Sequence, residues 1–293
     1  MTTYETRVAS KRRPRSLHAL AAAAALLLAP ALVQAQVTLG PALQTFGVLA
    51  ATTVTNIGPS VVAGNVGLSP GVAIVGFPPG TATGTFEINS LTAVQAKTEL
   101  TTALNTAAGT ACTTNLTGQD LGGLTLTPGV YCFNTSAQLT GNLTLDFQGN
   151  PNASFLFRTG STLTTASNSS VLAINAAGSG CLQNVNFEVG SSATLGTGTN
   201  FAGNILAVAS ITLNTGANLR GRALASNGAV TLDSNLAVGG CPAAASVPGG
   251  PIPAPGAGRI ENVPTLQEWA LILLGLMLAG LGAWQQRRKA IAR

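Results

Sequence analysis

The sequence predicts a mainly β fold, a three-sided β-solenoid with one long α-helix packed alongside. The first observation behind this prediction is a recurring phrase, T-L-x-T-[A/G]-x-N, at residues 162–168, 194–200 and 212–218. The second is that residues 197–210 and 215–228 align at an offset of 18 residues. A fixed period of this length is typical of a solenoid, and it gives each of three sides about six residues, a strand and a corner.

The recurring phrase predicts which side chains point inward. Alternate side chains of a strand point to opposite faces, so the leucines of the phrase should stack inside and the threonines outside. The leucines are Leu163, Leu195, Leu213 and Leu232, the last in a degenerate fourth copy at residues 231–235. Coils lie ~4.8 Å apart, so the phrase becomes a column of hydroxyl and methyl groups. The alternative is that Asn and Gly only relieve strained corners, while Thr only suits exposed strands.

Residues 89–108 are expected to form the helix, because this segment lacks Gly and Pro. Its apolar stripe should face the rest of the domain, and consists of alanines with Leu91, Val94, Leu100 and Leu104. Thr92 and Gln95 have the spacing of a capping box. Asn89 or Ser90 could equally cap the first turn, and Gly109 should end the helix.

The remaining sequence is typical of one β domain. Short apolar runs at 124–127, 154–158 and 203–209 are separated by Gly and Asn, which is a pattern of strands and turns. We expect this domain over residues 36–241. A Pro/Gly/Ala linker should follow at residues 242–262.

The N-terminus has the three parts of a secretory signal peptide. Basic Lys11, Arg12, Arg13 and Arg15 precede an apolar run at 17–32, and Val33-Gln34-Ala35 supplies a cleavage pattern. We predict that residues 1–35 are removed by cleavage after Ala35. A membrane anchor is the alternative, but the apolar run is short for a bilayer span. Arg12-Arg13 also hints at twin-arginine export, although Pro14 follows where that signal usually differs.

The C-terminus has a second apolar run, at residues 269–284, followed by Arg287, Arg288 and Lys289. The run is at the short limit for a spanning helix, and Trp at both ends suits the membrane interface. Positive charge stays inside, so we expect a cytoplasmic C-terminus and an external domain.

The charge that remains between the two ends excludes a nucleic-acid-binding function. The five basic residues between positions 36 and 262 are Lys97, Arg158, Arg220, Arg222 and Arg259. The seven acids there are Glu87, Glu99, Asp120, Asp146, Glu188, Asp233 and Glu261, which gives a net charge of −2. Binding nucleic acid needs clustered Lys and Arg to neutralise phosphates.

The scarcity of reactive side chains predicts a protein that is not an enzyme and has no cofactor or metal. The one histidine, His18, lies in the predicted signal peptide, which removes His-dependent triads and the usual zinc and copper sites. The acids are scattered, without a calcium- or magnesium-binding cluster. A carboxylate pair brought together by folding, as in glycosidases, is the open alternative.

The four cysteines are Cys112, Cys132, Cys181 and Cys241. An even number in an exported chain favours two disulfides. Of the three possible pairings we favour Cys112–Cys132 with Cys181–Cys241. The alternative is buried free thiols.

Four long segments resemble the microbial ice-binding protein family: FGVLAATTVTNIGPSVVAGNVGLSPG, GFPPG, LTGQDLGGLTLTPGVYCF and FAGNILAVASITLNTGA, beginning at Phe46, Gly76, Leu116 and Phe201. The resemblance covers about residues 37–240. It implies an irregular, discontinuous three-sided right-handed β-solenoid with one long helix alongside. It also implies ice binding through one flat face, where some members carry T-[A/G]-x-[T/N] phrases.

Mapped onto this sequence, the resemblance predicts an ice-binding face that follows the recurring phrase. The predicted residues are Thr165, Ala166, Asn168, Thr194, Thr197, Gly198, Asn200, Thr212, Thr215, Gly216, Asn218, Thr231 and Ser234. Ser234-Asn235 departs from the pattern, so the fourth rung is the weakest. A neighbouring face around Ala209-Ser210 and Asn227-Gly228 is the alternative surface.

The predicted partner is therefore an ice crystal, held by a monomer through adsorption. A face opposing ordered water should be flat, rigid and free of charges, which hold their own hydration shells. The alternative function is a surface structural or adhesive module that binds glycan or cells. Carbohydrate sites usually need aromatic platforms, and the mature domain has one Tyr, Tyr131, and no Trp.

The tail, residues 263–293, resembles IPTL-type C-terminal sorting signals of Gram-negative bacteria. VPTLQEW at residues 263–269 fits this pattern apart from Val in place of Ile. The resemblance implies recognition in the inner membrane, processing by a sorting protease, and delivery to the cell surface or the medium. A permanent anchor is the alternative.

Overall fold

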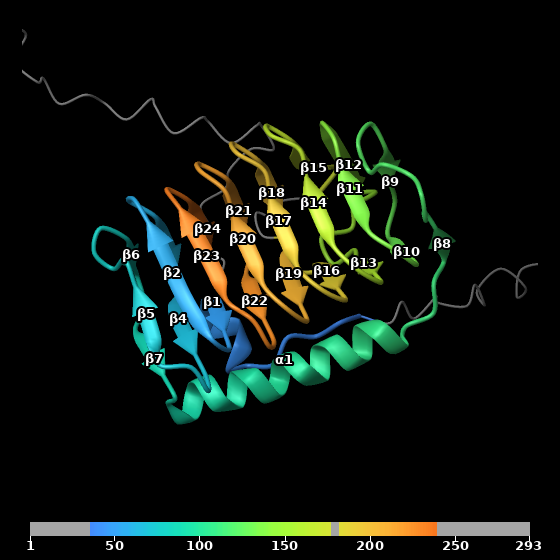
Figure 1. Cartoon of the computed structure of the whole chain (residues 1–293). Coiled ribbons are helices and arrows are strands. Elements are labelled where there is room, and N and C mark those ends of the chain that lie inside the picture. Colours follow the sequence, from blue (N-terminus) through green and yellow to red (C-terminus); the bar gives the residue numbers. More distant parts are fainter. Residues whose placement is uncertain (1–35, 177–181, 239–293) are drawn as a thin grey trace, which may run out of the picture. The chain divides into compact units, whose positions relative to one another are not determined.

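The computed structural model describes residues 36–176 and 182–238, which form three parallel β-sheets and one long helix (Figure 1). In spatial order, sheet A contains β7 (Phe86–Ile88), β4 (Asn65–Leu68), β1 (Phe46–Ala50), β22 (Ala223–Ala225), β19 (Asn204–Ala207), β16 (Val185–Val189), β13 (Phe155–Thr159), β10 (Gly129–Phe133) and β8 (Thr114–Asn115). Sheet B contains β11 (Ala137–Leu139), β14 (Leu163–Thr165), β17 (Ala193–Leu195), β20 (Ile211–Leu213), β23 (Val230–Asp233), β2 (Thr53–Ile57) and β5 (Ala73–Val75). Sheet C contains β6 (Thr81–Ala82), β3 (Val61–Ala63), β24 (Leu236–Val238), β21 (Asn218–Arg220), β18 (Asn200–Ala202), β15 (Ser170–Ile174), β12 (Asn142–Asp146) and β9 (Thr125–Leu126).

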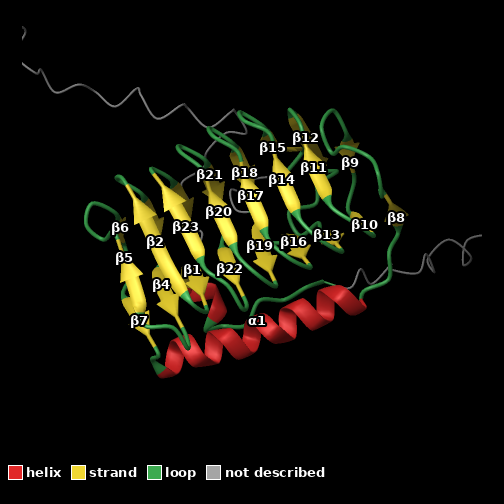
Figure 2. Ribbon diagram, viewed as in Figure 1, coloured by secondary structure: helices red, strands yellow, loops and turns green. Residues whose placement is uncertain are grey.

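Each coil of the chain contributes one strand to each sheet. β22, β23 and β24 lie in sheets A, B and C in turn, and the preceding strands β19, β20 and β21 repeat that order. Every pairing between these strands is parallel. The prediction of a mainly β, three-sided solenoid is therefore confirmed (Figure 2).

The coils do not stack in the order of the sequence. β1 lies between β4 and β22, and β2 lies between β5 and β23. The first coils, residues 46–88, therefore stack on the coil formed by residues 223–238 (Figure 1). The chain then returns through the helix to the other end of the stack and resumes at β8. This arrangement is the discontinuity that the family resemblance implies.

Helix α1 (Leu91–Gly109) lies along sheet A (Figure 2). The Ser90 side chain caps it by accepting a hydrogen bond from the backbone N–H of Ala93 at 3.1 Å, so one of the two simpler alternatives for the cap is correct. The predicted apolar stripe is only half right, since Leu91 is 90% exposed and Val94 48% exposed. Small residues permit close approach to the sheet, and the buried side chains are Ala93, Ala96, Leu100, Ala103, Leu104 and Ala107.

The first described residues are held between α1 and sheet A. They include a short 3-10 helix, η1 (Leu43–Thr45). A chain of hydrogen bonds runs along the outside of sheet A, from Arg222 Nη1 to Asn204 Oδ1 at 3.2 Å and from Asn204 Nδ2 to Asn186 Oδ1 at 3.0 Å. Arg222 also donates to the main-chain oxygen of Gln44. Burial lowers the pKa of Arg222 to about 10, which still leaves it protonated at neutral pH.

Aromatic side chains fill one part of the space between the three sheets. Tyr131, Phe157 and Phe187 occupy the same register on successive strands of sheet A. The ring centroids are 5.4 Å apart between Tyr131 and Phe157 and 4.4 Å apart between Phe157 and Phe187. Phe201 of sheet C continues the stack, with its ring centroid 4.6 Å from that of Phe187. Stacked, fully buried rings stiffen the scaffold that carries the outer faces.

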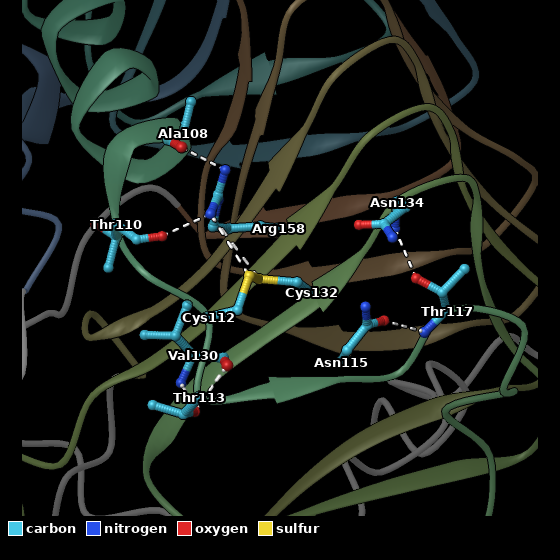
Figure 3. Close-up of a disulfide and its surroundings, with 10 residues drawn as sticks. All are labelled: Ala108, Thr110, Cys112, Thr113, Asn115, Thr117, Val130, Cys132, Asn134 and Arg158. Carbon is cyan, nitrogen blue, oxygen red and sulfur yellow. Dashed lines mark hydrogen bonds between the residues drawn. A yellow bond between two sulfur atoms is a disulfide. The ribbon is translucent and has the colours of Figure 1, made fainter.

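The predicted disulfide between Cys112 and Cys132 is confirmed, with the two Cα atoms 5.9 Å apart. It joins the chain just after α1 to strand β10 (Figure 3). Arg158, on the neighbouring strand, donates hydrogen bonds to the main-chain oxygens of Ala108 and Thr110 at the end of α1. Its Nη1 also lies 3.6 Å from the Sγ of Cys112. The C-terminal end of the helix is thus fixed to sheet A by a covalent bond and by a cation.

Several predicted features lie outside the described residues. They are the signal peptide (1–35), the second predicted pair (Cys181 and Cys241), the linker (242–262) and the tail (263–293). Within residues 36–176 and 182–238, no helix is long and apolar enough to cross a bilayer.

Candidate binding face

Five threonines occupy one outward position on five neighbouring strands of sheet B. The strand register places them side by side in the order Thr164, Thr194, Thr212, Thr231 and Thr55. We call this set the threonine column. Gln138 continues it at one end and Val75 at the other. Neighbouring strands lie ~4.8 Å apart, so the column forms a regular row of hydroxyl and methyl groups across the sheet.

The threonine column is open to solvent. Its five side chains are exposed or half-buried. Among the described residues, none provides a hydrogen-bond partner for these five hydroxyl groups. The hydroxyls are therefore available to bind water or another external partner.

A second outward column lies two residues earlier on the same strands. It consists of small side chains, namely Ser136, Thr162, Ser192, Ser210, Ala229, Thr53 and Ala73. Its hydroxyls are partly engaged, because Ser192 accepts from the backbone N–H of Ser210 and Ser210 accepts from that of Ala229. Small residues beside the threonine column leave no protruding side chain, so the face is flat.

The residues between the two outward columns point into the core. Leu163, Ala193, Ile211, Val230 and Val54 follow one another across the sheet, and each is at most 1% exposed. Their close packing fixes the strands beneath the face. The β-branched threonines above them have few rotamers, so the surface is rigid in both backbone and side chain.

Sheet B carries almost no charge. Asp233, at the end of β23, is the one charged residue among its strands. The cations nearby serve the opposite side of the molecule, because Lys97 donates to the main-chain oxygen of Ala225 at 2.9 Å and Arg222 to that of Gln44 at 3.0 Å. Within the described part of the chain, three or more His, Cys, Asp or Glu side chains do not gather anywhere as a metal site would require.

The turns between sheets B and C also stack on one another. Asn168, Gly198, Gly216 and Ser234 share a positive φ, between 54° and 68°. Backbone hydrogen bonds align these turns, from Gly198 N to Thr215 O at 3.1 Å and from Gly216 N to Asp233 O at 3.0 Å. The residues that precede the left-handed positions form a second set, which we call the corner column: Ser167, Thr197, Thr215, Asp233 and Ile57.

The fold and this face agree with a family comparison. The model of the ice-binding-like family matches residues 48–238. The chain belongs to the ice-binding-like family. A second match, to the IPTL-CTERM motif, covers residues 263–288.

Relatives of this ice-binding-like chain share both its sequence and its fold. An ice-binding protein of Nostoc sp. (strain HG1) is 54% identical over 197 residues, which cover 67% of this chain and 72% of the relative. The crystal structure of an ice-binding protein from an Antarctic biological consortium is 45% identical, with a TM-score of 0.66 over 69% of this chain and 90% of that one. The ice-binding protein of the Antarctic ascomycete Antarctomyces psychrotrophicus is 38% identical, with a TM-score of 0.67 over 71% of this chain and 100% of that one.

The structure of this ice-binding-like chain separates the predicted face residues into two groups. Thr194, Thr212 and Thr231 lie in the threonine column. The others lie at the corner or beyond it, namely Thr165, Ala166, Asn168, Thr197, Gly198, Asn200, Thr215, Gly216, Asn218 and Ser234. Gly198 and Gly216 adopt the positive φ that the corner alternative expects.

The first copy of the phrase is out of step with the other two, which corrects its predicted alignment. Leu163 pairs with Ala193, not with Leu195, and Thr164 pairs with Thr194. Thr165 is consequently turned inward and is 3% exposed, with its hydroxyl 2.8 Å from that of Thr199. The physical reason is the inward alternation of apolar residues, which sets strand register more strongly than similarity of the corner residues.

Ser234 is also displaced from its predicted position beside Thr215. The turn after β23 is one residue shorter than the preceding one, since Thr212 pairs with Thr231 while Asn218 pairs with Leu236. Asp233 therefore lies beside Thr215 and accepts a hydrogen bond from its hydroxyl.

Asn200 and Asn218 begin strands of sheet C. Their amide groups bind each other, with Asn218 Nδ2 3.2 Å from Asn200 Oδ1. Asn218 is 6% exposed. These two side chains thus join neighbouring coils and offer little to an external surface.

Two members of the threonine column, Thr164 and Thr55, were not among the predicted face residues. Thr53-Val54-Thr55 has the alternation of a half-buried strand, but nothing local indicates that it pairs with Thr231. Of the alternative surface, Ser210 belongs to the second outward column of sheet B. Asn227 instead lies in the turn between sheets A and B, where its N–H donates to the main-chain oxygen of Val208.

Proposed function

We propose that the protein binds ice by adsorption of sheet B, as a monomer and without turnover of a substrate. The observation that carries this proposal is the threonine column, five hydroxyls in register on a flat surface with one charge at its edge. The printed names of the relatives support the same function, since those proteins are ice-binding proteins.

The chemistry of threonine suits a surface of ordered water. Its methyl group makes apolar contact, while its hydroxyl can take the place of a water molecule at the lattice edge. Each contact is weak, but the core beneath the column holds all five side chains in place before binding. Little conformational freedom is then lost on adsorption, so the weak contacts add. A protein bound in this way hinders the advance of the ice front.

The alternative, a glycan-binding or adhesive module, has less support. The most evident hollow in the described chain has a volume of about 410 Å³ and is lined mainly by polar side chains, among them Gln148, Asn150 and Asn152. Its one aromatic residue, Phe147, is 1% exposed and cannot serve as a platform for a sugar ring.

We further propose that residues 36–241 act outside the cell and that the tail directs the protein to the surface. The match to the IPTL-CTERM motif supports export and surface association. β24 ends at Val238 in sheet C, and the equivalent strand of the preceding coil, β21, is followed by the turn into sheet A at Gly221. The linker therefore starts at the corner between sheets C and A, across the core from sheet B, which leaves the proposed face free. The bacterium would be Gram-negative, with the tail processed at the inner membrane by a sorting protease.

Slow freezing of a solution tests the ice-binding proposal directly. We expect the protein to enter a growing ice crystal, whereas solutes without affinity for ice stay in the liquid. A protein that remains in the liquid phase at all growth rates would show that the function is wrong, and glycan arrays would then test the alternative.

A further inference from the structure

Asp233 is a charged residue at the edge of an otherwise uncharged face. It is the last residue of β23, two positions after Thr231, so its side chain leaves the same side of sheet B as the threonine column. It also belongs to the corner column, between Thr215 and Ile57. The surface thus changes character at one coil, from hydroxyls to a carboxylate.

The carboxylate of Asp233 engages the polar groups of the corner. Thr215 donates its hydroxyl hydrogen to Oδ2, and the Ser234 hydroxyl lies 3.2 Å from Oδ1. Thr215 therefore differs from Thr212, whose hydroxyl has no partner among the described residues. A charged carboxylate also retains its hydration shell strongly, so ordered water around Asp233 cannot easily be replaced by the ice lattice.

We propose that Asp233 bounds the ice-contacting surface at the corner between sheets B and C. This inference rests on the proposed ice-binding function of sheet B. The carboxylate holds the hydroxyl of Thr215 and keeps the corner column hydrated, so adsorption uses the threonine column and not the corner. Asp233 is then a specificity-determining residue, because it limits which part of a continuous hydroxyl-rich surface meets ice.

The substitution Asp233→Asn tests this role. It removes the charge and keeps one oxygen acceptor, so the turn should persist and the melting temperature should change by less than ~2 °C. Without the charged hydration shell, we expect thermal hysteresis at equal molar concentration to rise at least ~1.5-fold. Asp146→Asn is the matched control, because Asp146 also ends a strand, β12, and accepts hydrogen bonds from the following turn, but lies on sheet C. It should leave thermal hysteresis unchanged.

Thr215→Val provides a second, independent readout. In the otherwise unchanged protein this substitution should not alter thermal hysteresis, because the lost hydroxyl is bound to Asp233. In combination with Asp233→Asn it should remove most of the gained activity. Equal activity of Asp233→Asn, Asp146→Asn and the original protein would overturn the proposal. So would an equal loss on Thr215→Val with and without Asp233→Asn, since the corner would then already contact ice.

Failure of this inference can be distinguished from failure of the proposed function. If the original protein does not enter ice, the function itself is wrong. If it enters ice and loses this property on Thr212→Tyr, while Asp233→Asn has no effect, only the role of Asp233 is wrong.

Discussion

Thr212 lies directly opposite Thr194 on the neighbouring parallel strand of sheet B, 18 residues earlier in the chain. The same position on the next strand is occupied by Thr231. Since the side chains beneath them are fully buried, the spacing of these hydroxyls is set by the backbone and cannot adjust to a ligand. Such a surface suits a partner that is itself periodic and rigid, which is the physical basis of the predictions below.

Thr212→Tyr should abolish most of the thermal hysteresis and of the recrystallisation inhibition. The ring would hold the face away from the lattice by its own width and disturb the neighbouring rungs as well. Because Thr212 is half-buried on an outer face, we expect the free energy of unfolding to change by only ~0.5 kcal/mol. Thr144→Tyr is the matched control, a half-buried outward threonine on β12 of sheet C. Full activity of Thr212→Tyr, with the fold intact, would place the binding surface elsewhere.

Thr55→Tyr should also reduce ice activity, although less than Thr212→Tyr. Thr55 lies far from Thr212 in the sequence, but only Thr231 separates them in the threonine column. A ring near the end of the column blocks fewer rungs than one at its centre. Thermal hysteresis of the two variants, measured at equal concentration, checks this order. If Thr55→Tyr were silent, the ice contact would be confined to the coils with the 18-residue period.

The sequence predicts the solenoid because its period is local. Residues 18 apart repeat the same corner and the same inward leucine, and this spacing reappears in the register of β17 with β20 and of β18 with β21. The helix is equally local, since its composition excludes strands and turns. The face of the helix is less predictable, because contact with the flat sheet A selects Ala96 and Ala103 over the larger Leu91 and Val94.

The site is only partly predictable, because two of its five threonines depend on non-local pairing. Thr164 precedes Thr194 by a coil of 30 residues instead of 18, so counting from the repeat reaches Thr162. Thr55 joins the column only because the first coils stack on the last one. The displaced Ser234 has a similar cause, since a turn shortened by one residue changes which side chain follows Thr215. Loop lengths of this kind follow from the packing of the whole stack.

Removing the disulfide should destabilise the domain without altering the face. It closes a segment with a sequence separation of 20, and bridges of this kind typically contribute ~2–4 kcal/mol. Cys112→Ser with Cys132→Ser should therefore lower the melting temperature, while the folded fraction keeps its thermal hysteresis. A calorimetric scan under non-reducing conditions provides the measurement. An unchanged melting temperature would contradict a stabilising role.

Arg158→Gln should be destabilising for a related reason. Glutamine is too short to reach the main-chain oxygens of both Ala108 and Thr110, so two buried acceptors at the end of α1 lose a charged donor, at a cost of ~1–3 kcal/mol. Because Arg158 Nη1 lies 3.6 Å from Cys112 Sγ, its effect should not add to that of removing the disulfide. Denaturant unfolding of the single and combined variants measures the coupling. Strict additivity would show that the two contacts fix the helix independently.

The stability of the fold should increase as the pH is raised above 8. Burial lowers the pKa of Lys97 from 10.5 to about 8. Between these two values the unfolded chain holds a proton that the folded protein has released, so the free energy of unfolding rises with pH. Screening by solvent at this partly exposed site should limit the gain to ~1 kcal/mol. Urea unfolding at pH 7.5, 8.5 and 9.5 measures it, and Lys97→Met should abolish the slope. A slope that survives in Lys97→Met would have to come from another group.

Deletion of residues 263–293 should release the protein from cells without impairing the ice-binding face. The deleted segment contains the region that matches the IPTL-CTERM motif, and the described solenoid ends before it, at Val238. In a Gram-negative host that carries the corresponding sorting system, the full chain should fractionate with membranes or the cell surface. The truncated chain should appear in the soluble periplasmic or extracellular fraction with equal thermal hysteresis per mole. Substitution of Pro264, Thr265 and Leu266 by alanine is the matched control, because it alters the motif while leaving the apolar run in place. If the substituted chain were sorted like the original, the apolar run alone would act as a simple anchor. If the truncated chain also stayed with the cells, retention would depend on the solenoid or the linker, and the proposed role of the tail would be wrong.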